Sequence, residues 1–198
     1  MRLSKILRLD YTSLLIPITL CLEEQFDYVL ALLLAATVHE CGHLLAARLL
    51  GISVLSMHVS VFGAHLQLSD PLISYKNEWL LCAAGPLFSG LLALVCLTCS
   101  SLLPQLPLLT SLGEISIVLG TVNLLPVGWL DGGRMLHAIC YQLFTPIVAR
   151  AIVQSVSFFF FLALWMSSVY LILRAGHSLS LFVFSFSLFL RFFQPKPK

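Results

Sequence analysis

Apolar stretches of about 18 or more residues recur along this 198-residue chain, and they constrain its fold more than any other feature. Charged residues make up only 10% of the sequence, whereas a typical soluble domain carries about 25%. A soluble fold of this size could not bury that much apolar surface. The stretches are too uniformly apolar for the alternating strands of an outer-membrane barrel. The sequence therefore predicts an all-α polytopic membrane protein.

The apolar stretches predict about six transmembrane helices. The second would be roughly 34 Å long as a helix, which is enough to cross the hydrocarbon of a bilayer. The first is short and contains Pro17, so it could extend toward Leu3 or insert only half-way. The fourth runs into an irregular segment at Asn123. The six candidate segments are 9–22, 28–50, 79–103, 112–123, 152–173 and 179–193.

The distribution of Lys and Arg predicts the orientation in the membrane. If the N-terminus is cytoplasmic and all six segments cross, every Lys and Arg except Arg174 lies on the cytoplasmic side, in agreement with the positive-inside rule. Both termini are then cytoplasmic, and the chain is a multi-pass protein of the cell membrane. The net charge of +2 and the lack of a long basic run give no indication of nucleic-acid binding.

The segment between the second and third candidate spans, ISVLSMHVSVFGAHLQLS at residues 52–69, is rich in β-branched residues and partly alternating. It predicts a β-hairpin at the cytoplasmic interface, with a turn near Phe62. An irregular amphipathic loop is the alternative. Because no internal repeat or linker interrupts the chain, we expect a single integral-membrane domain over residues 1–198.

The pattern His39-Glu40-Cys41-Gly42-His43 is an H-E-x-x-H sequence inside the second candidate span. On a helix, residues i and i+4 lie on one face, so the two imidazoles can share one Zn²⁺. Glu40 then faces the open position of the metal, where it can accept a proton from a water molecule. Ionisable side chains are costly within a membrane, and a divalent cation would compensate for them. A chance match or a hydrogen-bonded cluster is the alternative.

A site with two histidines needs a third protein ligand, and Asp131 is the carboxylate whose surroundings fit this role best. It lies in the segment NLLPVGWLDGG, where Pro126, Gly128, Gly132 and Gly133 are expected to interrupt any helix. Non-helical backbone at membrane depth is tolerated only against protein or a cavity, which a buried metal site would provide. An interfacial turn with a solvated Asp131 is the alternative.

Both motifs are expected near the cytoplasmic side. Arg48, which we place at the cytoplasmic face, follows His39 by about 14 Å of helix. Arg134 follows Asp131 within a single turn. The metal site is therefore expected to open toward the cytoplasm.

The H-E-x-x-H sequence together with the pattern N-x-x-P-x-x-x-x-D-G, each on its own span, resembles the site-2 protease family of intramembrane zinc metalloproteases. The segment NLLPVGWLDGGR is most similar to the stage IV sporulation protein FB group. The resemblance implies that His39, His43 and Asp131 bind one Zn²⁺ per chain and that Glu40 is the catalytic base. It implies that Asn123 is a catalytic residue near the substrate or the tetrahedral intermediate. It also implies that the hairpin binds unwound substrate by strand addition.

Two features depart from the family pattern. Family members often have G-P-x-x-N on the third span, but here Gly85-Pro86 is followed by Ser89 in the place of Asn. A hydroxyl can still donate one hydrogen bond. Sporulation relatives often continue into a nucleotide-sensing CBS domain, whereas we expect neither a CBS nor a PDZ domain in this chain.

The residues and the resemblance together predict an intramembrane zinc metalloprotease that cleaves in or near the transmembrane segment of a membrane-bound substrate. The substrate would be a membrane-spanning or membrane-tethered protein, such as a tethered pro-sigma factor, and inhibitory membrane partners would regulate cleavage. The first alternative is a catalytically silent membrane scaffold, and the second is a metal transporter. A transporter would need further ligands along its path, which the outer halves of the spans do not offer apart from Cys96 and Cys99.

Overall fold

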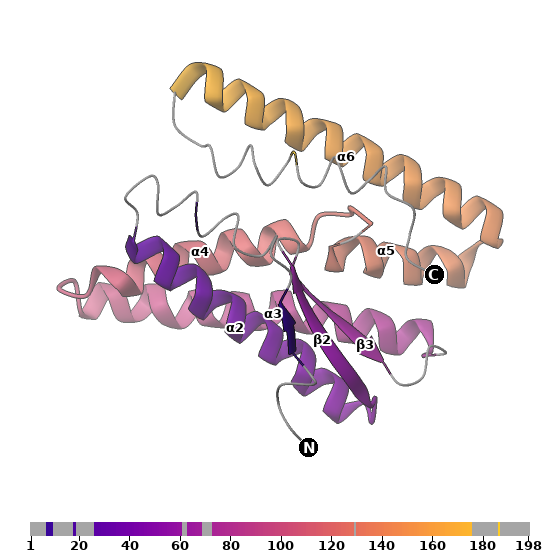
Figure 1. Cartoon of the computed structure of the whole chain (residues 1–198), viewed down its shortest axis with the longest axis horizontal. Coiled ribbons are helices and arrows are strands. Elements are labelled where there is room, and N and C mark those ends of the chain that lie inside the picture. Colours follow the sequence, from indigo (N-terminus) through magenta and orange to yellow (C-terminus); the bar gives the residue numbers. More distant parts are fainter. Residues whose placement is uncertain are drawn as a thin grey trace.

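Five helices and three short strands form the part of the chain that the computed structural model describes (Figure 1). That part comprises residues 7–9, 18, 26–60, 63–68, 73–128, 130–175 and 186. In chain order the elements are β1 (Leu7–Leu9), α2 (Phe26–Leu49), β2 (Val54–Ser60), β3 (Gly63–Leu68), α3 (Tyr75–Leu102), α4 (Pro107–Asn123), α5 (Asp131–Leu143) and α6 (Pro146–Ala175).

Three of these helices, α2, α3 and α6, are long and apolar enough to cross a membrane. They correspond to the second, third and fifth expected segments. Helices α3 and α6 begin somewhat earlier than expected, at Tyr75 and Pro146. Helix α4 has 17 residues and also begins early, at Pro107, because proline is favoured in the first turn of a helix. The helical character that the sequence predicts is thus confirmed.

The first and sixth expected segments, 9–22 and 179–193, lie outside the described residues except at Leu9, Ile18 and Phe186. Leu9 ends strand β1, so the extension of a helical first span toward Leu3 is wrong. The number of membrane crossings stays a prediction.

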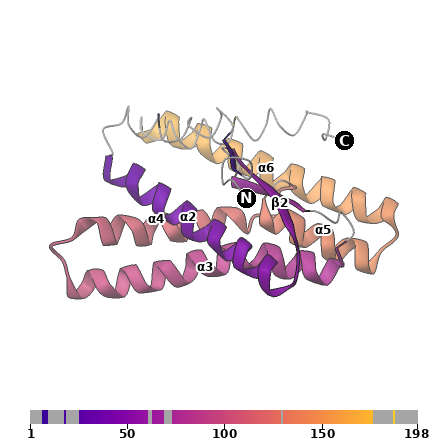
Figure 2. The same cartoon turned by 60° about the horizontal axis from the view of Figure 1, so that its bottom comes forward.

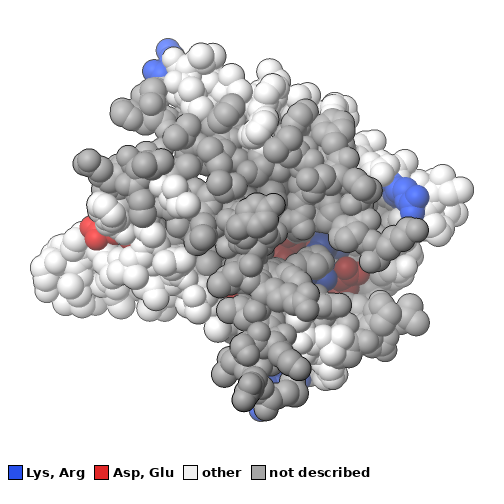
Figure 3. All heavy atoms as spheres, in the orientation of Figure 1, with Lys and Arg blue, Asp and Glu red and all other residues white. Residues whose placement is uncertain are grey.

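Helices α2, α3 and α4 pack against one another, and α5 packs against both α3 and α6 (Figures 1 and 2). Small residues hold many of the buried positions, among them Ala31, Ala35 and Ala93. Many large apolar side chains, such as Leu87 and Leu94, are exposed instead. On the face drawn in Figure 3, charged side chains are few among the described atoms. Small residues between helices and large apolar residues outside are typical of helices that pack in a lipid environment.

Two backbone hydrogen bonds end helix α2 shortly before strand β2 begins. The amide of Gly51 donates to the carbonyl of Arg48 at 3.2 Å, and the amide of Ile52 donates to the carbonyl of Ala47 at 2.8 Å. This pair of bonds is a Schellman motif. Gly51 adopts the positive φ of 68° that the motif requires, which a residue without a side chain does at little cost.

Strands β2 and β3, which lie between α2 and α3 in the chain, form a small sheet with the N-terminal strand β1 in the order β1–β2–β3. Strands β2 and β3 run antiparallel, with His58 opposite His65, and β1 pairs parallel to β2. The sequence did not indicate strand β1. Residues 61 and 62, which include the expected turn at Phe62, lie outside the described residues. The position of this sheet at the membrane interface stays a prediction.

The irregular segment before Asp131 is shorter than the sequence suggests. It covers residues 124–130, of which residue 129 is not described, and α5 begins at Asp131. The expectation that Gly132 and Gly133 interrupt the helix is therefore wrong, because both lie in its first turn. Close packing explains why they are glycines: a Cβ on Gly132 would overlap the carbonyl of Leu124, and one on Gly133 would overlap that of Val127.

Candidate metal centre

Two imidazoles from α2 meet inside the helix bundle. His39 and His43 lie one turn apart and are both buried. Their Nε2 atoms are 3.3 Å apart, and the ring planes are nearly perpendicular, at 77°. The i, i+4 spacing thus brings both rings to the buried face of α2.

Asp131 brings a carboxylate to the same point from the first turn of α5. Its Oδ2 atom lies 3.1 Å from Nε2 of His39 and 3.1 Å from Nε2 of His43. The positive end of the α5 dipole favours a negative charge at this position. Among the described residues, these three side chains form the one group of three His, Cys, Asp or Glu donors close enough to share a metal ion.

The spacing of the three donor atoms fits a zinc ion. Zinc bonds of about 2.0–2.1 Å in a tetrahedron separate the ligand atoms by about 3.3–3.4 Å. The observed separations of 3.1, 3.1 and 3.3 Å are close to that value. Two imidazole nitrogens and one carboxylate oxygen also leave a fourth position open, as catalytic zinc sites require.

Contacts from α3 determine which nitrogen of each ring faces Asp131. Nδ1 of His43 donates to the carbonyl oxygen of Leu81 at 2.8 Å, so the lone pair of a neutral ring lies on Nε2. Nδ1 of His39 lies 2.8 Å from Oγ of Ser89, which is fully buried. With both rings in this tautomer, three electron-pair donors converge on one point. A cation at that point would relieve their repulsion, and the Nδ1 contacts are of the kind that orient metal-binding histidines.

Gly85 allows α3 to approach the two rings closely. Leu81, Gly85 and Ser89 follow one another at intervals of four residues and therefore share one face of α3. A Cβ on Gly85 would overlap Nε2 of His43 and would lie 2.7 Å from Nε2 of His39. The site thus depends on a backbone position at which no side chain fits.

The two expected catalytic residues lie on α2 and α4. Glu40 directly follows His39, and one of its carboxylate oxygens is fully buried. Asn123 is the last residue of α4 and is 7% exposed. Its Nδ2 donates to the carbonyl of Leu119 at 3.0 Å, which uses one of the two amide hydrogens. Both polar groups are thus largely enclosed by the helix bundle.

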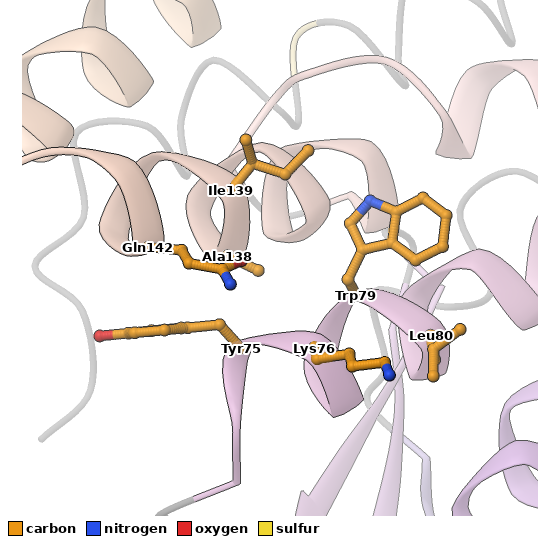
Figure 4. Close-up of a pocket in the computed structure, with 7 residues that line it drawn as sticks. All are labelled: Tyr75, Lys76, Trp79, Leu80, Ala138, Ile139 and Gln142. Atoms are coloured by element: carbon orange, nitrogen blue, oxygen red, sulfur yellow. The ribbon is translucent and has the colours of Figure 1, made fainter.

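An ion pair and a groove lie between α3 and α5. Nε of Arg134 is 3.7 Å from Oε1 of Glu78, which ties the first turn of α5 to the start of α3. The groove has a volume of about 430 Å³ and mostly apolar walls (Figure 4). Its lining residues are Tyr75, Lys76, Trp79, Leu80, Ala138, Ile139 and Gln142. Because none of them belongs to the cluster around Asp131, the groove is separate from the candidate metal centre.

Comparison with known proteins assigns the chain to one family. The family model described as Peptidase family M50 matches residues 27–114 and 105–164. The chain belongs to peptidase family M50. A zinc metalloprotease of Methanocaldococcus jannaschii is 30% identical over 112 residues, which are 54% of this chain and 32% of that protein. A putative zinc metalloprotease of Synechocystis sp. is 34% identical over 122 residues, which are 58% of this chain and 32% of that protein.

This M50 chain spans about a third of the length of the curated relatives it matches. A solved structure described as a site-2 protease from Methanocaldococcus jannaschii is similar over nearly the whole chain, with a TM-score of 0.73. The match covers 96% of this chain and 90% of that chain at 20% sequence identity. At this identity the similarity shows the fold alone. Family and fold together support an integral membrane protein.

The sequence of this M50 chain predicts that His39, His43 and Asp131 lie together, but it does not reveal the contacts around them. Leu81 acts through its backbone carbonyl, which no residue type signals. The sequence marks Ser89 only as a departure from G-P-x-x-N, whereas its hydroxyl contacts the ring of His39. One sequence signal for these contacts was available. Leu81, Gly85 and Ser89 are spaced four residues apart on the third expected span, which matches the spacing of the two histidines on the second.

Proposed function

We propose that this chain is an intramembrane zinc metalloprotease of the site-2 type. It hydrolyses a peptide bond in or near the transmembrane segment of a membrane-bound protein. The observation that carries the proposal is the convergence of three electron-pair donors at zinc spacing, with Glu40 next to the first of them. Because the carbonyl of Leu81 accepts a hydrogen bond from Nδ1 of His43, a neutral His43 ring would turn the lone pair of Nε2 toward Asp131, which is the arrangement that metal binding requires.

The proposed reaction assigns a task to each polar side chain. When bound by His39, His43 and Asp131, zinc would supply an activated water and would polarise the carbonyl of the scissile bond. Glu40 accepts a proton from the attacking water and then delivers it to the leaving amine nitrogen. Asn123 donates an amide hydrogen toward the negative charge that develops on the carbonyl oxygen.

The substrate in this proposal is a membrane-spanning or membrane-tethered protein whose helix unwinds locally, because helical carbonyls are already hydrogen-bonded. Strand β3 is one of the two edge strands in the described order β1–β2–β3, so its far edge can pair with an extended segment. We place this sheet at the cytoplasmic interface and both termini in the cytoplasm. A more specific version of the proposal is that the chain releases a tethered pro-sigma factor during sporulation. Only the likeness of NLLPVGWLDGGR to the stage IV sporulation protein FB group supports this version.

The substitution Glu40→Gln separates the chemistry from metal binding. We expect the variant to keep about one zinc per chain, because the three metal-binding side chains are intact. Cleavage should fall by at least about 100-fold, because the amide cannot accept the proton. Elemental mass spectrometry would measure zinc, and a quenched fluorescent peptide with an apolar single-span sequence would report cleavage in the same detergent.

The matched control for this experiment is Glu114→Gln on α4. Glu114 is exposed and accepts a hydrogen bond from Tyr28, so its replacement should change neither zinc content nor cleavage. Cleavage by Glu40→Gln at the wild-type rate would contradict the role of the base. A wild-type chain that holds zinc but cleaves nothing would favour a silent scaffold.

A further inference from the structure

Hydroxyl groups on the described helices mostly bond to the backbone of their own helix. Thr98 donates to the carbonyl of Leu94, and Ser116 donates to that of Leu112, each about one turn back. This local bond satisfies a hydroxyl in an apolar helix without a partner elsewhere. Ser157, in the middle of α6, is an exception.

Ser157 joins α6 to the irregular segment that precedes Asp131. Its Oγ donates to the carbonyl oxygen of Pro126 at 3.1 Å, and the residue is 3% exposed. A Cβ on Gly128 would lie 3.8 Å from the same Oγ, so the segment passes close to α6 at two points. Water does not compete for a hydrogen bond that is buried among apolar groups.

The described backbone between Pro126 and Asp131, at residues 127, 128 and 130, is tightly packed. The amide of Leu130 donates to the carbonyl of Val127 at 2.8 Å, and both side chains are buried. Gly133, in the first turn of α5, packs directly against the carbonyl of Val127. A displacement of Pro126 would therefore be passed to the turn that carries Asp131.

We propose that Ser157 is a positioning residue of the metal centre. Its hydroxyl holds the segment 124–130 against α6 and thereby sets the distance of Asp131 from the two histidines. The proposal rests on the proposed zinc site and extends it to a helix that supplies no ligand. Helix α6 is also the least buried of the three candidate spans, with 17% of its most apolar stretch buried. A buried hydrogen bond from this helix to another segment is therefore a notable contact.

Two substitutions test the hydroxyl. Ser157→Ala removes it, and Ser157→Cys keeps nearly the same volume with only a weak donor. The first measurement is the rate of zinc release from the purified full chain into excess chelator. We expect both variants to release zinc about 3- to 20-fold faster than wild type. The second is hydrogen exchange over residues 124–134 in the zinc-free chain, which should accelerate in both variants.

Two control variants show whether the effect is specific. Ser116→Ala removes the hydroxyl of a fully buried residue that bonds within α4. Ser167→Ala removes an exposed hydroxyl that bonds within α6. Neither should change zinc release or exchange over 124–134. A merely structural role for Ser157 would lower the unfolding temperature and leave the rate of zinc release from the folded chain unchanged.

Wild-type rates of zinc release and exchange in both Ser157 variants would overturn the proposal. Equal acceleration by Ser116→Ala would also overturn it, because loss of any buried hydroxyl would then suffice. If Ser157→Ala does not fold, the rates measured for Ser157→Cys decide whether the proposal stands. A wild-type chain that binds no zinc would refute the proposed function, and the exchange comparison would still test the link from Ser157 to the segment.

Discussion

At the residue scale, the candidate metal centre depends on the face of α3 as much as on the residues that supply donor atoms. Leu81 and Ser89 contact the Nδ1 atoms of the two histidines, and Gly85 between them leaves room for the rings. The two histidines could be predicted because ionisable side chains in an apolar run need compensation. Asp131 could be predicted because it lies in a Pro- and Gly-rich segment at the end of a candidate span. The supporting contacts could not be predicted, because neither the backbone carbonyl of Leu81 nor the missing side chain of Gly85 has a chemical signature in the sequence.

Gly85→Ala tests the close approach of α3. The added Cβ would overlap the ring of His43, so we expect zinc affinity to fall by at least about 10-fold, as for other changes that disturb the support of a metal ligand. Competition with a chelator of known affinity measures this change.

Gly90→Ala on the same helix is the matched control for Gly85→Ala. A Cβ at Gly90 meets open space, and alanine is a better helix former by about 1 kcal/mol, so zinc affinity should stay at the wild-type value. Equal affinities in the two variants would show that the ring of His43 does not lie where the structure places it.

At the element scale, the sequence predicts the long helices well and α5 poorly. Continuous apolar runs the length of a bilayer leave few alternatives to α2, α3 and α6. Helix α5 is short and begins Asp131-Gly132-Gly133, a pattern that normally marks a turn. Tertiary packing against the segment 124–130 overrides that local preference. Strand β1 was missed because its partner, β2, is far away in the sequence.

Gly132→Ala tests this packing. Its Cβ would overlap the carbonyl of Leu124 and displace the first turn of α5, so we expect a loss of about 1–3 kcal/mol in the free energy of unfolding. Zinc release should also become faster, because Asp131 moves with that turn. Gly128→Ala is the control, since its Cβ would make only an ordinary contact with Ser157. Similar stabilities for both variants would argue against the observed start of α5.

At the scale of the whole molecule, exposed large apolar residues and buried small ones indicate a bundle surrounded by lipid. Helix α3 crosses this bundle from Tyr75 to Leu102. In the proposed topology, the positive-inside rule predicts that its start faces the cytoplasm. The segment after its end, near Gln105, would then face the outer side.

Cysteine labelling tests this orientation. In a chain whose native cysteines have been replaced, Lys76→Cys should react with a membrane-impermeant thiol reagent in inside-out vesicles but not in intact cells. Gln105→Cys should show the opposite pattern, because both residues are exposed at opposite ends of α3. The reverse pattern of labelling would invert the topology and turn the metal centre away from the cytoplasm.

The most direct test of the account is the zinc content of the purified chain, measured by elemental mass spectrometry for wild type, His43→Ala and Asp131→Ala. Asp27→Ala, which removes an exposed carboxylate from the first turn of α2, serves as the control. We predict about one zinc per chain in wild type and in Asp27→Ala, and little in the other two variants. No zinc in wild type, or a zinc content unchanged by Asp131→Ala, would contradict the three-residue metal centre.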